Sequence, residues 1–194
     1  MKKIKSVIVA IVCISLVVGF YYYLSNRTPK KNVENSTEAG EVAAVIGKDL
    51  ESSYPATPRE VIKYYNRLLT CFYNEEYTED QFEKMVDKVQ TLFDEDLISA
   101  NPREQYVTAL QADVMAYQAE KKIVATANVC GSDEVQFATV DGAECAYVSA
   151  SYFIRSSKVY YTSNQEYVLR KDSDGKWRIL GFQLLGGDET NAEE

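Results

Sequence analysis

The segment from Ala143 to Leu185 constrains the fold most, because it has the pattern of three consecutive antiparallel strands. Apolar and polar residues alternate between Ala143 and Ser156, which is the period of a strand that buries one face. The apolar set is Ala146, Val148, Ala150, Tyr152 and Ile154. A second run, Lys158–Asp172, is rich in Tyr and Val, both strand formers.

The second and third strands are joined by Asp172-Ser173-Asp174-Gly175, an Asp-Gly turn that is typical of a tight hairpin. A calcium loop is the alternative, but the further oxygen ligands that it needs do not follow Gly175. The third strand has apolar residues on both parities, Trp177 and Ile179 on one and Leu180, Phe182 and Leu184 on the other. A bulge near Gly181 would let both sets face the core.

Three helices are predicted upstream of these strands. Thr57-Pro58-Arg59-Glu60 and Thr78-Glu79-Asp80-Gln81 are capping-box starts, each followed by an apolar stripe at helical spacing. Asn101-Pro102-Arg103-Glu104 resembles the first start and opens a third helix. The intervening acidic run Asp94-Glu95-Asp96 is interpreted as a solvated helix end. Ile123–Cys130 and Glu134–Val140 are then predicted to form a hairpin turning at residues 131–133.

The N-terminal region indicates a membrane anchor. Residues 7–24 contain 18 residues without a charge, about 27 Å as a helix and close to the thickness of a bilayer core. We therefore expect a cytoplasmic stub at residues 1–6, a single-pass transmembrane helix at 7–24, and a flexible linker at 25–54. A cleaved signal peptide is the alternative, although the run is long and lacks an Ala-x-Ala-like site. An acidic tail is expected at residues 188–194.

Composition excludes several chemistries. The chain has no histidine, which removes Ser-His and Cys-His nucleophile pairs and most zinc sites. Six of the 21 basic side chains lie in residues 1–31, which hold no acidic residue, so the remainder carries a formal charge of −14. Such a domain repels phosphate backbones, and nucleic acid is not an expected partner. Cys130 and Cys145 either form a disulfide or are, with Cys71, buried thiols.

The element order predicts an α+β fold, with three helices packed on a curved antiparallel sheet of four to five strands. Together with the closing Asp174-Gly175-Lys176-Trp177-Arg178-Ile179, it resembles the nuclear transport factor 2-like superfamily, a cystatin-like cone, over residues 55–187. The chain with its single span is also similar to membrane-anchored proteins of Gram-positive bacteria.

The resemblance implies that a site, if there is one, lies in the mouth of the cone. The residues able to line it are Tyr147, Tyr152, Tyr160, Tyr161, Tyr167, Glu144 and Glu166. A tyrosine beside a desolvated carboxylate could transfer protons from carbon, as in isomerase or dehydratase members. Strand tyrosines are, however, ordinary sheet formers with a polar tip.

We therefore expect a non-enzymatic, extracytoplasmic module on the cell membrane that binds a partner protein or ligand in the envelope. No catalytic residue, metal or cofactor is expected, and the sequence does not identify a ligand-binding residue. The alternatives are a scaffold subunit of a secretion- or conjugation-type channel, by analogy of fold alone, and a tyrosine/carboxylate isomerase- or dehydratase-like enzyme.

Overall fold

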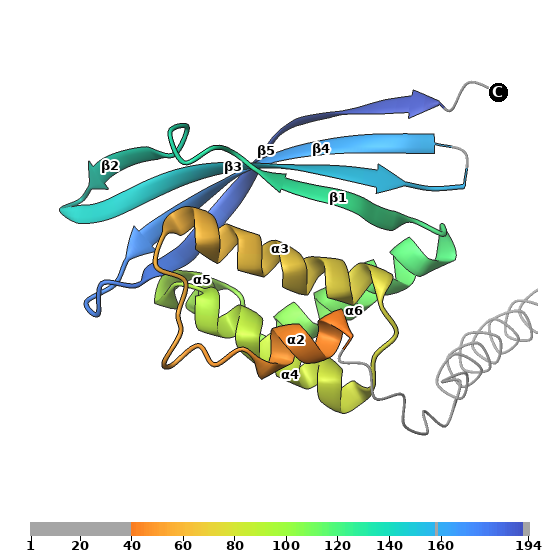
Figure 1. Ribbon diagram of the computed structural model, residues 1–194, viewed down its shortest axis with the longest axis horizontal. Coiled ribbons are helices and arrows are strands. Elements are labelled where there is room, and N and C mark those ends of the chain that lie inside the picture. Colours follow the sequence, from red (N-terminus) through yellow and green to blue (C-terminus); the bar gives the residue numbers. More distant parts are fainter. Residues whose placement is uncertain (1–39, 158, 192–194) are drawn as a thin grey trace, which may run out of the picture. The chain divides into compact units, whose positions relative to one another are not determined.

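The structure is a computed structural model that describes residues 40–157 and 159–191. It has an α+β architecture in which five helices cover one face of a five-stranded antiparallel sheet (Figure 1). The helices are α2 (Glu41–Gly47), α3 (Pro58–Asn74), α4 (Glu79–Leu92), α5 (Glu95–Ala100) and α6 (Arg103–Ala119). The strands are β1 (Ile123–Val129), β2 (Gln136–Val140), β3 (Ala143–Arg155), β4 (Val159–Lys171) and β5 (Trp177–Asn191). The predicted α+β class and strand number are confirmed.

The sheet order is β1-β3-β4-β5, and β2 also pairs with β3. The predicted hairpin between Ile123–Cys130 and Glu134–Val140 is therefore wrong. β1 pairs with residues 150–155 of β3, and β2 pairs with residues 143–147. Both fit on one edge because β3 is 13 residues long. The hairpin turn lies instead at Asp141 and Gly142, whose φ angles of 51° and 83° suit a two-residue turn between twisted strands.

The turn predicted between β4 and β5 is confirmed. The backbone N–H of Asp172 donates to Lys176 O at 2.8 Å, and Gly175 N–H donates to Asp172 O at 3.0 Å. The predicted bulge is also present, because Val168 pairs with Gly181 while Leu169 pairs with Ile179. It places Phe182 and Leu184 opposite the inward residues Tyr167 and Gln165, on the same face as Ile179, as predicted. Only Ile179 is buried, however, and Phe182 and Leu184 stay exposed.

Helix starts at α3 and α4 have the capping boxes that the sequence predicts. The Thr57 hydroxyl accepts from Glu60 N–H, and the Thr78 hydroxyl accepts from Gln81 N–H. The third start differs, since no side chain caps α6 and its N-cap position is Pro102. Asn101 instead closes α5, where its N–H donates to Leu97 O at 2.9 Å.

The boundaries expected for the linker and the tail are both wrong in part. Residues 41–47 form α2, whose Val42 and Val45 are buried against the domain core, so the folded part begins before residue 55. At the other end β5 runs to Asn191, because the length of β4 offers Val159 as its last pairing partner. The expected stub, the span at 7–24 and residues 192–194 lie outside the described residues. Within residues 40–157 and 159–191 no helix has the length and apolarity needed to cross a bilayer.

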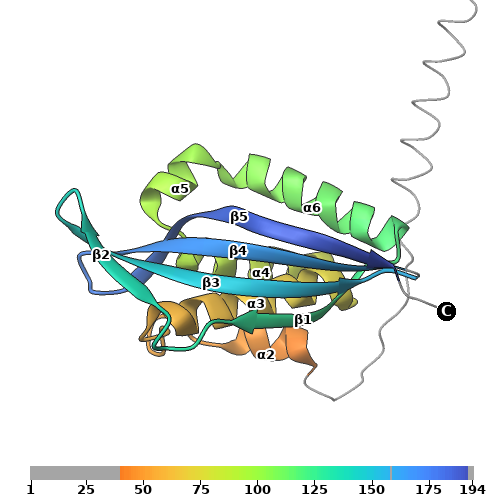
Figure 2. The same cartoon turned by 90° about the horizontal axis from the view of Figure 1, so that it is seen from above.

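The core lies between the sheet and α3, with α4 beneath. The inward residues of β3 that the alternation predicts are all buried. Seen from above, α2 lies on the β1 side of the sheet and α6 on the β5 side (Figure 2). The side chain of Asn74, at the end of α3, donates to Val124 O at 2.8 Å and accepts from Val124 N–H at 2.9 Å. This pair satisfies the edge of β1 next to its bulge and holds α3 on the sheet.

Candidate functional site

A cavity of about 250 Å³ lies between α3, α6 and strands β3, β4 and β5. Its volume is slightly below the roughly 300–1,000 Å³ usual for ligand pockets, so it suits only a small molecule. The sheet contributes the inward residues of β3 and β4, which stand opposite each other in register, as Tyr152 does to Ser163. The lining residues are Tyr65, Leu69, Tyr73, Asp113, Tyr117, Val124, Tyr152, Ile154, Ser163, Gln165, Tyr167 and Phe182.

A chain of hydrogen bonds crosses the inner end of this cavity. The hydroxyl groups of Tyr152 and Tyr167 are 2.6 Å apart. Tyr152 Oη also bonds Asn66 Oδ1 at 2.6 Å, and Tyr167 Oη bonds Gln165 Oε1 at 2.7 Å. Both tyrosines and Asn66 are buried. The strands fix the hydroxyl pair, because Tyr167 pairs with Val148 on β3, so that Tyr152 and Tyr167 share one face.

The number of hydroxyl protons in this hydrogen-bond chain decides how one of its amide groups must be oriented. Three hydrogen bonds join four side chains, but the two hydroxyl groups supply only two protons. The third donor must be an amide group, either Asn66 or Gln165 presenting its NH₂ to a hydroxyl oxygen. Amide orientation is assigned from such networks. Either amide orientation gives the chain its third donor, so the donor direction along the chain is set by which amide presents its NH₂ group.

A second polar pair lies at the rim of the cavity. The hydroxyl of Tyr73, from α3, donates to a carboxylate oxygen of Asp113, from α6. The rings of Tyr73 and Tyr117 pack with centroids 4.4 Å apart. This cluster links the two helices and places one carboxylate at the mouth.

The tyrosine hydroxyls remain protonated near neutral pH. Burial raises the pKa of Tyr152 to about 12, although its bonds to Tyr167 and Asn66 act in the opposite direction. Burial, and then the neighbouring Tyr152, raise the pKa of Tyr167 well above the ordinary value. The pKa of Tyr73 is also raised well above its ordinary value, by burial and by its hydrogen bond to Asp113. None of these hydroxyls is therefore a base at neutral pH.

Of the seven residues named from the sequence, the structure brings only Tyr152 and Tyr167 into the cavity. Tyr147 and Tyr160 lie on the outer face of the sheet, where Tyr160 stacks on Phe153 at 5.3 Å. Tyr161 has the inward parity but packs beyond the cavity under Lys122, whose Nζ is 4.7 Å from its ring centroid. Glu166 also faces outward and accepts from Gln183 Nε2 at 2.9 Å.

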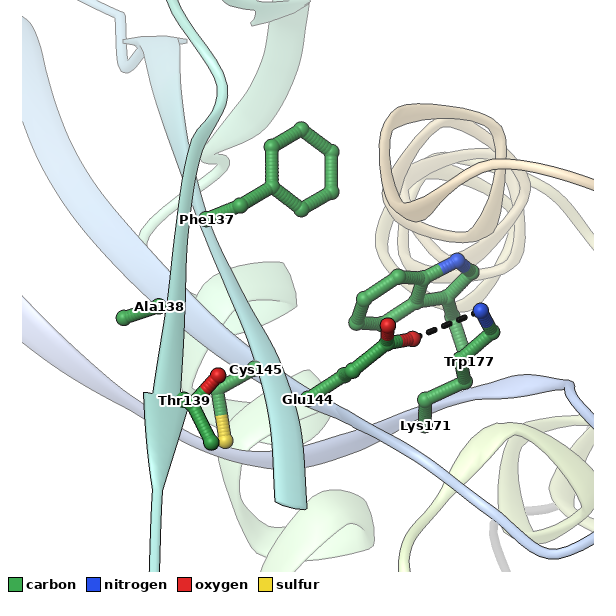
Figure 3. Close-up of a pocket in the computed structure, with 7 residues that line it drawn as sticks. All are labelled: Phe137, Ala138, Thr139, Glu144, Cys145, Lys171 and Trp177. Atoms are coloured by element: carbon green, nitrogen blue, oxygen red, sulfur yellow. Dashed lines mark hydrogen bonds and ion pairs between the residues drawn. The ribbon is translucent and has the colours of Figure 1, made fainter. Parts of the chain in front are cut away.

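Glu144 lines a different hollow, which Figure 3 shows. Phe137 of β2 and Trp177 of β5 project toward the same space, with ring centroids 5.8 Å apart. Glu144 forms an ion pair with Lys171 at 2.6 Å, and Lys171 also lies over the Trp177 ring. Both charged side chains are more than one-third exposed, so this is a solvated pair with little effect on stability. Among the described residues that line the cavity, Asp113 is the one carboxylate. It is bonded to Tyr73 and not to the Tyr152–Tyr167 pair.

A third hollow lies between α3 and β1 and has basic side chains. Arg59, Lys63 and Arg67 follow one another by four residues on α3, and Arg67 forms an ion pair with Glu41 at 2.6 Å. Asn66 also borders it, and its Nδ2 atom has no hydrogen-bond partner within the described part of the chain. Asn66 is the end member of the hydroxyl–amide chain and also lines this hollow, so it lies between the cavity and the hollow.

The three cysteines in the described part of the chain, Cys71, Cys130 and Cys145, are free. The N–H of Cys130 donates to Ser149 O at 2.9 Å, four residues along β3 from Cys145, and the disulfide alternative is not formed. Residues 40–157 and 159–191 contain no group of three acidic or cysteine side chains that could bind a metal ion.

The site residues that the sequence analysis missed come from the helices and also from the strands, where Gln165 and Phe182 were not candidates. Asn66, Tyr73 and Asp113 were not candidates, because the resemblance directed attention to the strands. A signal was present for Asn66, which is a polar residue inside the buried stripe of α3, between Ile62 and Leu69. A polar side chain at such a position needs a buried partner. No pattern in the sequence indicates that Asp113 approaches Tyr73, 40 residues earlier.

Comparison with known proteins gives one result. A family model described as "Domain of unknown function (DUF6715)" matches residues 1–182. No curated protein matches the chain.

Proposed function

We propose a function for this chain, which belongs to the DUF6715 family, a domain of unknown function. The chain is a non-enzymatic, membrane-anchored module that holds a small ligand outside the cytoplasm. The observation that carries the binding part is the cavity between α3, α6 and the sheet, with a hydroxyl–amide hydrogen-bond chain at its inner end. Cavities with an apolar wall and a few convergent polar groups are the usual form of a ligand site.

The protonation of the hydroxyls favours binding over turnover. A general base must be deprotonated near the operating pH, whereas burial raises the pKa of Tyr152 to about 12. The two strand carboxylates that could have activated a tyrosine, Glu144 and Glu166, lie outside the cavity. The one carboxylate among the described lining residues, Asp113, accepts from Tyr73 and not from Tyr152 or Tyr167, which supports a binding role over the proton-transfer alternative.

Ligand binding is testable with small fragments that have an apolar body and one hydroxyl or amino group, among them 2-phenylethanol. The full chain, held in dodecyl maltoside micelles and carrying ¹³C-labelled tyrosine, is titrated and followed by NMR. We expect shifts at Tyr152 and Tyr167 and none at Tyr160 on the outer face. Ser163→Phe, which fills the cavity from β4, should abolish them.

Two outcomes contradict this proposal. Fragments that leave the Tyr152 and Tyr167 resonances unmoved show that the cavity does not accept ligands. Shifts that persist in Ser163→Phe place binding elsewhere.

The anchor is proposed from the uncharged run at residues 7–24 and has its own test. Replacing both Val12 and Val17 by Asp should release the protein from the membrane or lead to its degradation. Each charge placed in the middle of a span costs about 2.5–3.5 kcal/mol on insertion scales. Membrane fractionation measures the effect, with Val12→Leu and Val17→Leu together as the matched control. An unchanged distribution of the Asp variant would show that this segment does not anchor the chain.

A further inference from the structure

The wall of the cavity is unusually rich in aromatic rings. Six of its twelve lining residues carry one: Tyr65, Tyr73, Tyr117, Tyr152, Tyr167 and Phe182. They come from both helices and from three strands, so the rings surround the space from several sides. Tyr65 and Tyr167 meet edge to face at 5.8 Å, and Phe182 packs on Tyr167 at 5.6 Å. Aromatic walls of this kind attract cations through the negative faces of the rings.

The charged groups of the cavity wall also favour a cation. Asp113 is the one charged side chain among the described lining residues, and none of those residues is basic. The hydroxyl of Tyr73 holds its carboxylate at the rim. The chain beyond residue 31 has a formal charge of −14, which raises the local concentration of cations and repels anions.

An ammonium group already lies on rings next to the mouth. Lys122 Nζ is 5.7 Å from the ring centroid of Tyr117, which lines the cavity, and 4.7 Å from that of Tyr161. Glu120 pairs with this ammonium group at 2.7 Å and offsets its charge. The rings at the rim are thus arranged so that a cation can lie over them, and the neutralised Lys122 does not oppose a second cation at the mouth.

We propose that the ligand of this cavity is a small organic cation, an alkylated ammonium compound whose charged end lies among the aromatic rings close to Asp113. This inference rests on the proposed ligand-binding function and names the class of ligand. A quaternary ammonium group fits because its charge is spread over apolar methyl groups, which can lie on aromatic rings without giving up N–H hydrogen bonds to water. A hydroxyl or carbonyl at the other end of the ligand can join the Tyr152–Tyr167 chain, which accepts or donates according to its amide orientation.

The test compares choline with 3,3-dimethylbutan-1-ol, in which carbon replaces the nitrogen and the charge is lost. Both are titrated into the full chain in dodecyl maltoside micelles, which contain no ammonium group, and the tyrosine resonances are followed by NMR. We expect choline to bind more tightly by on the order of tenfold, the size of a partly desolvated cation–π contribution. Because the charge interaction is screened by salt, the difference should narrow at high ionic strength.

Two variants separate the sources of this preference. Asp113→Asn keeps an acceptor for Tyr73 and removes the charge, and Phe182→Leu removes an exposed ring but keeps an apolar side chain. Each should weaken the binding of choline several-fold more than it weakens the binding of the neutral alcohol. Asp174→Asn, in the exposed turn between β4 and β5, is the matched control because it also removes one negative charge. It should change the affinity for neither ligand.

The outcomes distinguish this inference from the function on which it rests. Equal binding of the two compounds, or tighter binding of the alcohol, overturns the cation class and leaves a ligand-binding cavity. Binding of neutral fragments without binding of choline does the same. If neither compound nor any fragment moves the cavity resonances, both the class and the proposed function are overturned.

Discussion

Replacing Arg170 by Ala should lower the free energy of unfolding by about 3 kcal/mol, because it leaves Asp94 buried without its cation. Asp94 is only 5% exposed. Arg170 Nε donates to Asp94 Oδ2 at 2.9 Å, and its Nη2 bonds both Asp94 and Asp96. Loss of one partner of a buried pair costs roughly 3–5 kcal/mol. The lower value applies because Asp94 keeps a hydrogen bond from Asp96 N–H at 3.0 Å.

The neighbouring residue on β4 provides the control. Lys171 pairs with Glu144 at 2.6 Å, but both side chains are exposed to solvent, and Lys171→Ala should cost about 1 kcal/mol or less. Urea unfolding of the two variants, with the slope of the transition compared as well as its midpoint, measures the difference. Equal effects of the two substitutions would mean that the Asp94–Arg170 pair does not hold the α4–α5 connection on β4.

The second large effect is expected in alkaline solution. Burial raises the pKa of Tyr152 and of Tyr64 to about 12, compared with about 10 in an unfolded chain. Between these values the folded state holds a proton that the unfolded state has released. The stability from each tyrosine is therefore complete below pH 10 and is lost as the pH rises toward 12. The loss is about 1.4 kcal/mol per pH unit for each such tyrosine, so the domain should unfold cooperatively above pH 10.

Denaturant unfolding at a series of pH values measures this dependence. Tyr152→Phe removes one titrating group, so its stability should fall with pH about 1.4 kcal/mol per pH unit less steeply than that of the natural chain. The hydroxyl is lost at every pH, which lowers stability uniformly without changing the slope. Val148→Ala, a nearby core substitution on β3, is the control for destabilisation alone and should keep the natural slope. An unchanged slope in Tyr152→Phe would contradict the burial argument.

Local patterns in the sequence predicted the elements that depend on local physics. The capping boxes at Thr57 and Thr78 hold because a hydroxyl, a backbone N–H and a side chain three residues away meet within one turn. The alternation in β3 predicted its buried face, from Ala146 to Ile154. The Asp-Gly turn at residues 174–175 was predicted for the same reason, whereas the equivalent signal at Asp141-Gly142 was overlooked.

The errors occurred where partners lie far apart in the chain. β1 and β2 look like a hairpin because they are adjacent in sequence, yet each pairs with β3. Asp94 belongs to an acidic run that was predicted to be exposed to solvent. It is instead buried, and it is hydrogen-bonded to Arg170, which is 76 residues away in the sequence. The site was predicted only in part for the same reason. The resemblance named Tyr152 and Tyr167 among its seven candidates, but the helix residues Tyr73 and Asp113, which complete the rim, were not among them.

The sequence by itself determined the three longer helices and the five strands, the inward residues of β3, the acidity of the domain and the absence of histidine chemistry. These properties depend on residue type and on neighbours within one or two turns of chain. Tertiary structure decided which strands pair, which hydroxyls meet, and that six aromatic rings and one carboxylate surround a single cavity. Those contacts form between segments brought together by burial of a shared core, and the pattern of either segment alone does not specify its partner.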